Sequence, residues 1–261
     1  MIVFFIEESN KNKIFKHIEV IKDKIIINKK VEKINKKDIN KINIILNNMK
    51  CNKVIISKKL KDNDILKNSL YSNNINIVNG KVLYKILLEK IIETTCIKNS
   101  INPKESQIAF TVNYLDSNIT KIIYNLSKTF KSISIVTNNI NSFKQLKEKL
   151  YNNEGVIITV TNNKRKALLK SSLIINYDFP EELINKYSIY DNSVIINTEE
   201  PIHIHKKRFN GKIINDYNIS LEKNSDIEIE LKKEKFKKFD IKDLTEVFIM
   251  QYPEEICNVI V

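Results

Sequence analysis

A basic pair directly after a strand-like segment is the feature of this sequence best suited to bind a ligand. Lys164 and Arg165 follow Val156–Thr161, and helical spacing continues from them to Lys170. Open α/β sheets bind ligands at the carboxyl ends of their strands, and the free amides at the start of a helix attract negative charge. The pair therefore predicts a site for a small anion, with Arg165 as the stronger ligand because its planar guanidinium can form two parallel hydrogen bonds. A solvent-exposed first helical turn is the alternative explanation.

Two other expected strands end in short polar side chains that would reach the same crevice. The strands are Ile108–Val112 and Ser132–Thr137. The candidate anion-binding residues that follow them are Asn113, Ser117, Asn138 and Asn139. Because parallel strands end at one edge of a sheet, we expect these residues to converge with Lys164 and Arg165 at that edge.

Two histidines and a second arginine form a separate candidate group. His203 and His205 alternate with isoleucines, so on a strand both would lie on one face. A metal site needs three or four ligands, and no cysteine or third histidine is near in sequence, so we predict no metal. Solvent-exposed histidines are the simplest explanation, and an anion site or a general base is the alternative. His203, His205 and Arg208 are therefore secondary candidates for anion binding.

The scarcity of glycine excludes the usual phosphate-binding loops. The chain has 3 glycines, Gly80, Gly155 and Gly211, whereas average usage would give roughly 18. Each has a structural explanation: a turn before a helix, the end of a helix, and a hairpin turn at Asn210–Gly211. No Ser/His/Asp or Cys/His set lies at expected loop positions, so the sequence assigns no catalytic residue and leaves open whether the protein is an enzyme.

The formal net charge of +13 is compatible with a polyanionic partner, because lysines neutralise phosphates. The lysines are spread over the whole chain, however, and aromatic residues do not alternate with them as stacking platforms would. Arginine, the usual reader of guanine, occurs only at Arg165 and Arg208. A bias toward Ile, Lys and Asn is typical of an AT-rich genome and explains the charge without a partner, so nucleic acid is not favoured.

Cysteine usage and the absence of a long apolar segment predict a cytoplasmic protein. Cys51, Cys96 and Cys257 are odd in number, widely spaced and without a CxxC motif, which fits a reducing compartment. The opening apolar run ends at Glu7, too early for a signal peptide. No segment reaches the roughly 18 apolar residues that a membrane span needs.

The first part of the chain alternates short β-branched runs with amphipathic segments. The expected strands are Ile2–Ile6, Lys24–Asn28, Val54–Ser57 and Ile75–Val78. The expected helices are Asp38–Met49, Asp62–Tyr71 and a longer one from Val82 toward Cys96. Such alternation implies a parallel sheet covered by helices. The polar segment Lys98–Gln107 is the expected linker.

A second alternating series follows the linker. Its strands are Ile108–Val112, Ser132–Thr137, Val156–Thr161, Leu173–Tyr177 and Val194–Asn197. Its helices are Asn118–Phe130, Ser142–Tyr151, Lys164–Lys170 and Pro180–Lys186. Asp178, Glu181 and Glu182 are expected as acids at the start of the last of these helices. After Pro201 the pattern changes to the hairpin, an alternating strand at Ile227–Leu231 and a helix at Asp240–Gln251.

The sequence therefore predicts an α/β protein made of two successive strand–helix units with parallel sheets, and a small β-rich C-terminal appendage. The expected domains are residues 1–100, residues 101–200 and residues 201–261. The last of these would hold the hairpin and the C-terminal helix.

Residues 107–200 resemble the dinucleotide-binding domain of the shikimate dehydrogenase and glutamyl-tRNA reductase type. The resemblance lies in the order and length of IAFTV, ITKIIYNLSKTF, SISIVT and VIITVT. The segment SSLIINYDFPEEL that follows is similar to the family's acidic-or-small, hydrophobic, Asn strand. The resemblance implies a Rossmann-like fold for the second domain and the activity of an NAD(P)-dependent oxidoreductase.

The turn that should bind the pyrophosphate departs from the family pattern. Glycines let the backbone approach the phosphates there, but residues 112–118 contain none. Asp116 would place a carboxylate beside two phosphates, and Tyr114 and Leu115 would fill the approach. After the second strand, residues 137–139 offer neither an acid for ribose hydroxyls nor an arginine for a phosphate. We therefore predict that the protein has no cofactor.

The leading hypothesis is a non-catalytic binding or regulatory protein on a degenerate Rossmann-like scaffold, with a small anionic ligand or another protein as its partner. An NAD(P)-dependent oxidoreductase of the shikimate dehydrogenase type is the alternative, and a nucleic-acid-associated protein is the third hypothesis. The turn at residues 113–118 distinguishes the first two, because only a turn that admits a pyrophosphate would support the enzyme.

Overall fold

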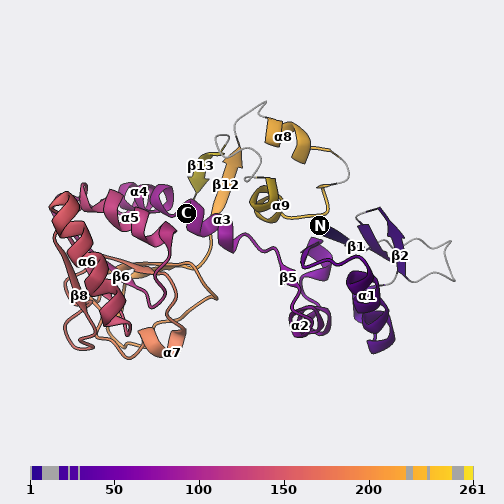
Figure 1. Cartoon of the computed structure of the whole chain (residues 1–261), viewed down its shortest axis with the longest axis horizontal. Helices are drawn as coiled ribbons and strands as arrows, with labels where there is room; N and C mark the ends of the chain where they lie inside the picture. Colours follow the sequence, from indigo (N-terminus) through magenta and orange to yellow (C-terminus); the bar gives the residue numbers. More distant parts are fainter. Residues whose placement is uncertain are drawn as a thin grey trace. The chain divides into compact units, whose positions relative to one another are not determined.

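The described part of the chain folds into an α/β structure with three sheets (Figure 1). The computed structural model describes residues 2–7, 18–22, 24–28, 30–221, 226–233, 236–248 and 256–260. Two compact units make up the fold: Met1–Leu83 with Leu221–Cys257, called unit 1, and Tyr84–Ser220 with Asn258–Val261, called unit 2. No helix within the described residues is both long and apolar enough to cross a membrane.

Unit 1 is built around a five-stranded sheet in the order β2-β3-β1-β4-β5. Its strands are β1 (Ile2–Glu7), β2 (Ile18–Ile21), β3 (Lys24–Ile27), β4 (Lys53–Ile56) and β5 (Asn76–Ile77). All run parallel except β2, which pairs antiparallel with β3. The helices are η1 (Val31–Lys33), α1 (Lys36–Asn48), η2 (Lys58–Leu60), α2 (Asp64–Ser72), α8 (Asp226–Leu231) and α9 (Ile241–Phe248).

Both faces of the unit 1 sheet are covered, which explains why β1 is apolar from Ile2 to Ile6. Successive side chains of a strand point to opposite faces. Val3 and Phe5 pack in one cluster with Ile42 of α1 and Leu66 of α2. On the other face, Phe4 and Ile6 pack with C-terminal residues from the segment 236–244. Unit 1 is thus completed by a part of the chain far from it in sequence.

Unit 2 contains a six-stranded sheet whose strands are all parallel. The strands are β6 (Gln107–Thr111), β7 (Ser132–Val136), β8 (Ile158–Thr161), β9 (Leu173–Asn176), β10 (Val194–Asn197) and β11 (Lys212–Ile214). The helices from the boundary of the units onward are α3 (Lys81–Ile86), α4 (Leu88–Lys98), α5 (Ser117–Ser127), α6 (Ile140–Glu154) and α7 (Glu181–Ile184). In Figure 1, α4, α5 and α6 lie beside β6 and β8. A small antiparallel sheet is formed by β12 (Asn218–Leu221) and β13 (Ile256–Ile260).

The strand order of unit 2 is that of a Rossmann fold. The order is β11-β10-β9-β6-β7-β8, so the chain builds outward from β6 in one direction and then from β9 in the other. The carboxyl ends of β6 and β9 therefore meet at the point where the order reverses, which is where doubly wound folds bind nucleotides. The predicted α/β class, with two strand–helix units, a Rossmann-like second unit and β structure near the C-terminus, is confirmed.

Residues after Pro201 differ from the sequence prediction. The hairpin at Asn210–Gly211 is wrong, because β11 pairs in parallel with β10 rather than with the residues before the turn. Gly211 is required for another reason: a Cβ there would lie 1.9 Å from the backbone oxygen of Ser193. The predicted strand Ile227–Leu231 is also wrong, since these residues fall in the helix α8.

Two predicted helices change as well. Lys164–Lys170 forms a series of turns with one isolated bridge, at Leu168, and no helix. The long helix from Val82 is divided at Leu87 into α3 and α4. The predicted C-terminal helix is present as α9, and residues 249–251 of that prediction lie outside the described residues.

The division into consecutive domains 1–100, 101–200 and 201–261 stays a prediction. Cleavage within Lys98–Gln107 by limited proteolysis, with a stable C-terminal fragment, would support it. First cuts within residues 108–197 would contradict it.

Candidate functional site

An internal carboxylate occupies the turn at the point where the strand order reverses. Asn113 follows β6 and Asp178 follows β9. The Asp178 carboxylate accepts hydrogen bonds from the backbone N–H of Asn113, at 2.7 and 2.9 Å, and from the backbone N–H of Tyr114, at 2.7 Å. Consecutive backbone amides that point at one anion form the kind of concave site that binds phosphates elsewhere. In Rossmann folds that bind dinucleotides, the first strand-to-helix turn lies against the pyrophosphate. In this protein the amides of the corresponding turn donate to Asp178.

Buried amides fix the strand ends around this turn. The Thr111 hydroxyl donates to Asn176 Oδ1 at 2.6 Å, and Asn176 Nδ2 donates to Asn197 Oδ1 at 2.8 Å. Asn197 Nδ2 in turn donates to Asn215 Oδ1 at 2.9 Å. This amide ladder crosses the carboxyl ends of β6, β9, β10 and β11. Asn176, the Asn of the strand that resembles the dehydrogenase family, therefore makes its hydrogen bonds inside the protein.

The predicted residues of the first two turns do come together. Asn113 Oδ1 accepts from the backbone N–H of Asn138 at 2.8 Å, and Asn139 Nδ2 donates to the backbone oxygen of Asn113 at 3.4 Å. Ser117 is exposed as the first residue of α5, whose N-cap is Asp116. The asparagine groups named here satisfy one another, and the hydrogen bonds join the loops that follow β6 and β7.

The structure assigns Asp116 to the start of α5. Its Oδ1 accepts from the Ile119 N–H at 2.7 Å and its Oδ2 from the Tyr177 hydroxyl at 3.0 Å, so both oxygens have partners within the protein. Tyr114 is 71% exposed. The carboxylate that holds the turn is that of Asp178, a residue that the sequence suggested only as an acid at a helix start.

The basic pair lies further along the sheet. Lys164 and Arg165 follow β8, which is the edge strand and two places from β6. Both residues are exposed, and the Asn163 side chain accepts hydrogen bonds from the backbone N–H groups of Arg165 and Lys166. The pair therefore begins a set of turns rather than a helix, so the expected helix amides do not support it.

The two histidines are bound to α7 instead of lying on a strand. His205 Nε2 lies 2.7 Å from Glu181 Oε1, and His203 Nδ1 lies 3.5 Å from Glu181 Oε2. The Asn185 side chain donates to the His203 oxygen at 2.8 Å and accepts from the His205 N–H at 2.8 Å. The contact with His205 is the main reason that the pKa of Glu181 is lowered. Arg208 is exposed on the same irregular segment.

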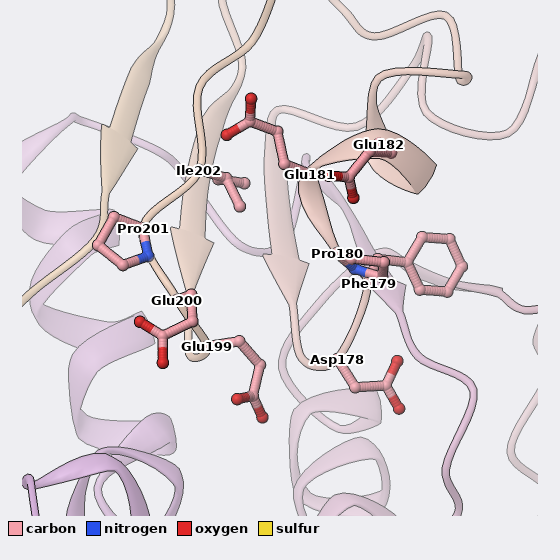
Figure 2. Close-up of a pocket in the computed structure, with 9 residues that line it drawn as sticks. All are labelled: Asp178, Phe179, Pro180, Glu181, Glu182, Glu199, Glu200, Pro201 and Ile202. Atoms are coloured by element: carbon pink, nitrogen blue, oxygen red, sulfur yellow. The ribbon is translucent and has the colours of Figure 1, made fainter. Parts of the chain in front are cut away.

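An acidic hollow of about 570 Å³ lies at the ends of β9 and β10 (Figure 2). It is lined by nine residues, namely Asp178, Phe179, Pro180, Glu181, Glu182, Glu199, Glu200, Pro201 and Ile202. Five of them are carboxylates, so the charge beside the turn is opposite to that of an anion site. Among the described residues, no group of three or more histidines, cysteines or carboxylates is arranged to hold a metal ion.

Lys85 pairs with one carboxylate of this hollow. Lys85 Nζ is 2.5 Å from Glu199 Oε1 and 4.6 Å from the ring centre of Tyr177. Burial raises the pKa of Asp178, and the two backbone amides and the charge of Lys85 offset part of that effect. Sequence analysis did not select Lys85 or Glu199, because nothing in their local sequence shows that α3 and the end of β10 meet.

Comparison with known proteins adds little to this geometry. No protein-family model matches the chain, and no curated protein matches its sequence. Part of the chain is similar to L-tryptophan dehydrogenase from Nostoc punctiforme, with 8% identity over 67% of this chain and 50% of that one, at a TM-score of 0.34. It is also similar to D-mandelate dehydrogenase from Rhodotorula graminis, with 11% identity over 80% of this chain and 76% of that one, at a TM-score of 0.31. The match thus spans half of the tryptophan dehydrogenase, and at these TM-scores neither likeness carries an argument about function.

Proposed function

We propose that this protein is a non-catalytic binding or regulatory protein on a degenerate Rossmann-like scaffold, without a dinucleotide cofactor. The observation that carries the proposal is the Asp178 carboxylate on the amides of Asn113 and Tyr114. Those amides are the donors that a pyrophosphate would need, and they already have an acceptor.

The charge around the turn supports the same proposal. Asp178 and Glu199 both line the acidic hollow, and Lys85 is already paired with Glu199. A phosphate about 4 Å from a carboxylate near a protein surface would be repelled by roughly 4 kcal/mol. A pyrophosphate placed here would meet this repulsion in addition to the loss of its amide donors.

An NAD(P)-dependent oxidoreductase of the shikimate dehydrogenase type is the second candidate. The strand order of unit 2 favours it, since the reversal between β6 and β9 lies where such enzymes bind their cofactor. The two candidates differ in one measurable property, which is affinity for the cofactor.

Calorimetric titration with NAD and NADP tests the proposal. We expect no saturable binding below millimolar cofactor, and micromolar binding would contradict the proposal and favour the oxidoreductase. A thermal-shift panel of nucleotides, oligonucleotides and anionic metabolites would show in parallel whether any anion or nucleic acid binds.

A small anionic ligand remains our proposal for the exposed basic pair at the end of β8. Its test compares Arg165→Ala with Arg208→Ala, using the anion that raises the melting temperature most. We expect the stabilisation to be lost in Arg165→Ala alone. Equal losses would indicate bulk charge, and a loss in Arg208→Ala alone would move the site to the segment that contains the histidines.

Localisation in the cytoplasm is also a proposal, based on cysteine usage. Cys51 and Cys96 are buried and form no disulfide, as a reducing compartment permits. Burial raises the pKa of Cys96 to about 11, so its thiol is protonated and unreactive near neutral pH. The side chain of Cys257 lies outside the described part of the chain.

A further inference from the structure

The contact between Asp178 and the turn after β6 joins groups 65 and 64 residues apart. Local sequence does not create it, and a carboxylate that only had to be solvated would need no backbone donors. Three short hydrogen bonds to two consecutive amides give Asp178 the position and partners of a bound oxyanion.

The neighbours of Asp178 have partners of their own. Asp116 is held by Ile119 and Tyr177, and Lys85 is held by Glu199. The Asn113 side chain is held by the loop after β7. Truncation of Asp178 would therefore leave two backbone N–H donors directed at a space the size of a carboxylate, with one negative charge fewer around it.

We propose that Asp178 is an internal oxyanion that closes the anion-binding turn of this Rossmann-like sheet and excludes external oxyanions from it. The inference rests on the proposed function, because it explains why the turn binds no dinucleotide. The chemical class that Asp178 excludes is a small carboxylate or phosphate, which would accept the same two hydrogen bonds from Asn113 and Tyr114.

Chemical rescue tests the inference. Asp178→Ala should lower the melting temperature, and sodium formate should restore it, whereas sodium chloride at the same ionic strength should not. By calorimetry, formate should bind Asp178→Ala at least tenfold more tightly than the unchanged protein. Inorganic phosphate serves as a second probe, and it too should bind Asp178→Ala more tightly than the unchanged protein.

Glu182→Ala is the matched control. It removes one carboxylate from the same hollow, but the two amides of the turn keep Asp178 as their acceptor. Equal gains of formate binding in both variants would mean that only bulk charge matters, and would overturn the inference. A folded Asp178→Ala protein without rescue would overturn it as well.

Asp178→Ser keeps the test decisive if the alanine variant does not fold. Its hydroxyl is too short to replace the carboxylate, so formate should again bind, and its failure to bind would count against the inference. Failure of the proposed function has a different signature, namely micromolar binding of NAD or NADP to the unchanged protein. If formate does not rescue the variant and neither NAD nor NADP binds the unchanged protein, the inference is contradicted and the proposed function is not.

Discussion

Residues with neutral amide side chains set the positions of the charged ones in unit 2. Asn176 and Asn197 are fully buried, and each both donates and accepts within the amide ladder. A buried polar group is costly unless its hydrogen bonds are made, so the ladder specifies one arrangement of the strand ends. Asp178 and Glu199 each lie two residues beyond a ladder asparagine, which fixes where their carboxylates emerge.

Gly211 is expected to be more sensitive to substitution than Gly155. A Cβ at this position would lie 1.9 Å from the Ser193 oxygen, and that oxygen accepts the Lys212 N–H that joins β10 to β11. Gly211→Ala should therefore destabilise unit 2 by about 3 kcal/mol, the upper end of the usual cost of overpacking. Chemical denaturation followed by circular dichroism measures the change.

Gly155→Ala is the control for this prediction. Gly155 has a φ of +66° at the end of α6, and nothing lies within 4 Å of a Cβ there. Only the left-handed conformation is penalised, by about 1–2 kcal/mol. An equal or larger loss in Gly155→Ala would show that close approach at Gly211 does not limit stability.

The sequence could identify the residues of the turn but not the group that binds them. Asn113, Asn138 and Asn139 follow consecutive parallel strands, so their convergence was predictable from topology. Asp178 lies just before a short helix, and an acid at that place has an ordinary local explanation. Its actual partners come from the packing of two turns that are distant in sequence, and local pattern contains no information about that packing.

At the scale of elements, the strands were predictable because the parallel sheet of unit 2 is buried. Val194–Asn197 is fully buried along its length, so it stands out as a continuous β-branched run. The structure of Ile227–Leu231 was not predictable in this way. Its alternating pattern indicates a strand, but residues 227 and 231 also lie about one helical turn apart. The helix gains an ion pair between Glu228 and Lys232 at 3.0 Å, which the strand interpretation does not use.

An ion pair with a fully buried carboxylate should make η2 depend on α9. Lys61 Nζ lies 2.5 Å from Asp243 Oδ2 and also contacts Asp240, and the Asp243 side chain is fully buried. Lys61→Met leaves a buried carboxylate without its partner, so we expect a loss of about 3 kcal/mol in the free energy of unfolding. The double variant Lys61→Met/Asp243→Leu should recover most of it, because an apolar pair needs no charge compensation.

The exposed pair of Lys67 and Asp64, 2.7 Å apart, provides the control. Lys67→Met should change stability by less than about 1 kcal/mol, as is usual for surface ion pairs. Urea denaturation of the four proteins gives all the values. If Lys61→Met is no worse than Lys67→Met, the buried pair does not stabilise the contact between η2 and α9.

The start of α3 should make stability depend on pH through Glu246. This carboxylate accepts from the N–H of Val82 at 3.1 Å, and burial is the main reason that its pKa is raised above 4.5. Its contribution to stability is therefore complete below the unfolded-state pKa and is lost as the pH rises through the higher folded-state value.

Glu246→Gln removes this titration and keeps an oxygen acceptor for α3. Because the pKa of Glu246 is raised in the folded state, the stability of the unchanged protein relative to Glu246→Gln should fall as the pH rises above about 4.5. Urea denaturation at several pH values across this range measures the difference. If this relative stability instead rises with pH, the hydrogen bonds from the amides of α3 lower the pKa of Glu246 by more than burial raises it.

For the whole molecule, the net charge of +13 does not describe the surface where a ligand would bind. The acidic hollow places five carboxylates together at the ends of β9 and β10 of a basic protein. Such a local field decides which ions approach that edge, while the net charge affects solubility and weak association. A search for ligands should therefore include cations as well as anions.

The two compact units should respond separately to core substitutions. Phe239 packs with Phe4 on one face of the unit 1 sheet, and Phe143 is buried in α6 of unit 2. Truncation of a buried phenylalanine costs about 3–5 kcal/mol. Phe239→Ala should therefore accelerate hydrogen exchange in β1 and β4, and Phe143→Ala should do so in β6 and β7.

Mass spectrometry of peptides from the four strands measures both effects, and each variant serves as the control for the other. Equal acceleration in all four strands by either variant would contradict the prediction and show that the two sheets unfold together.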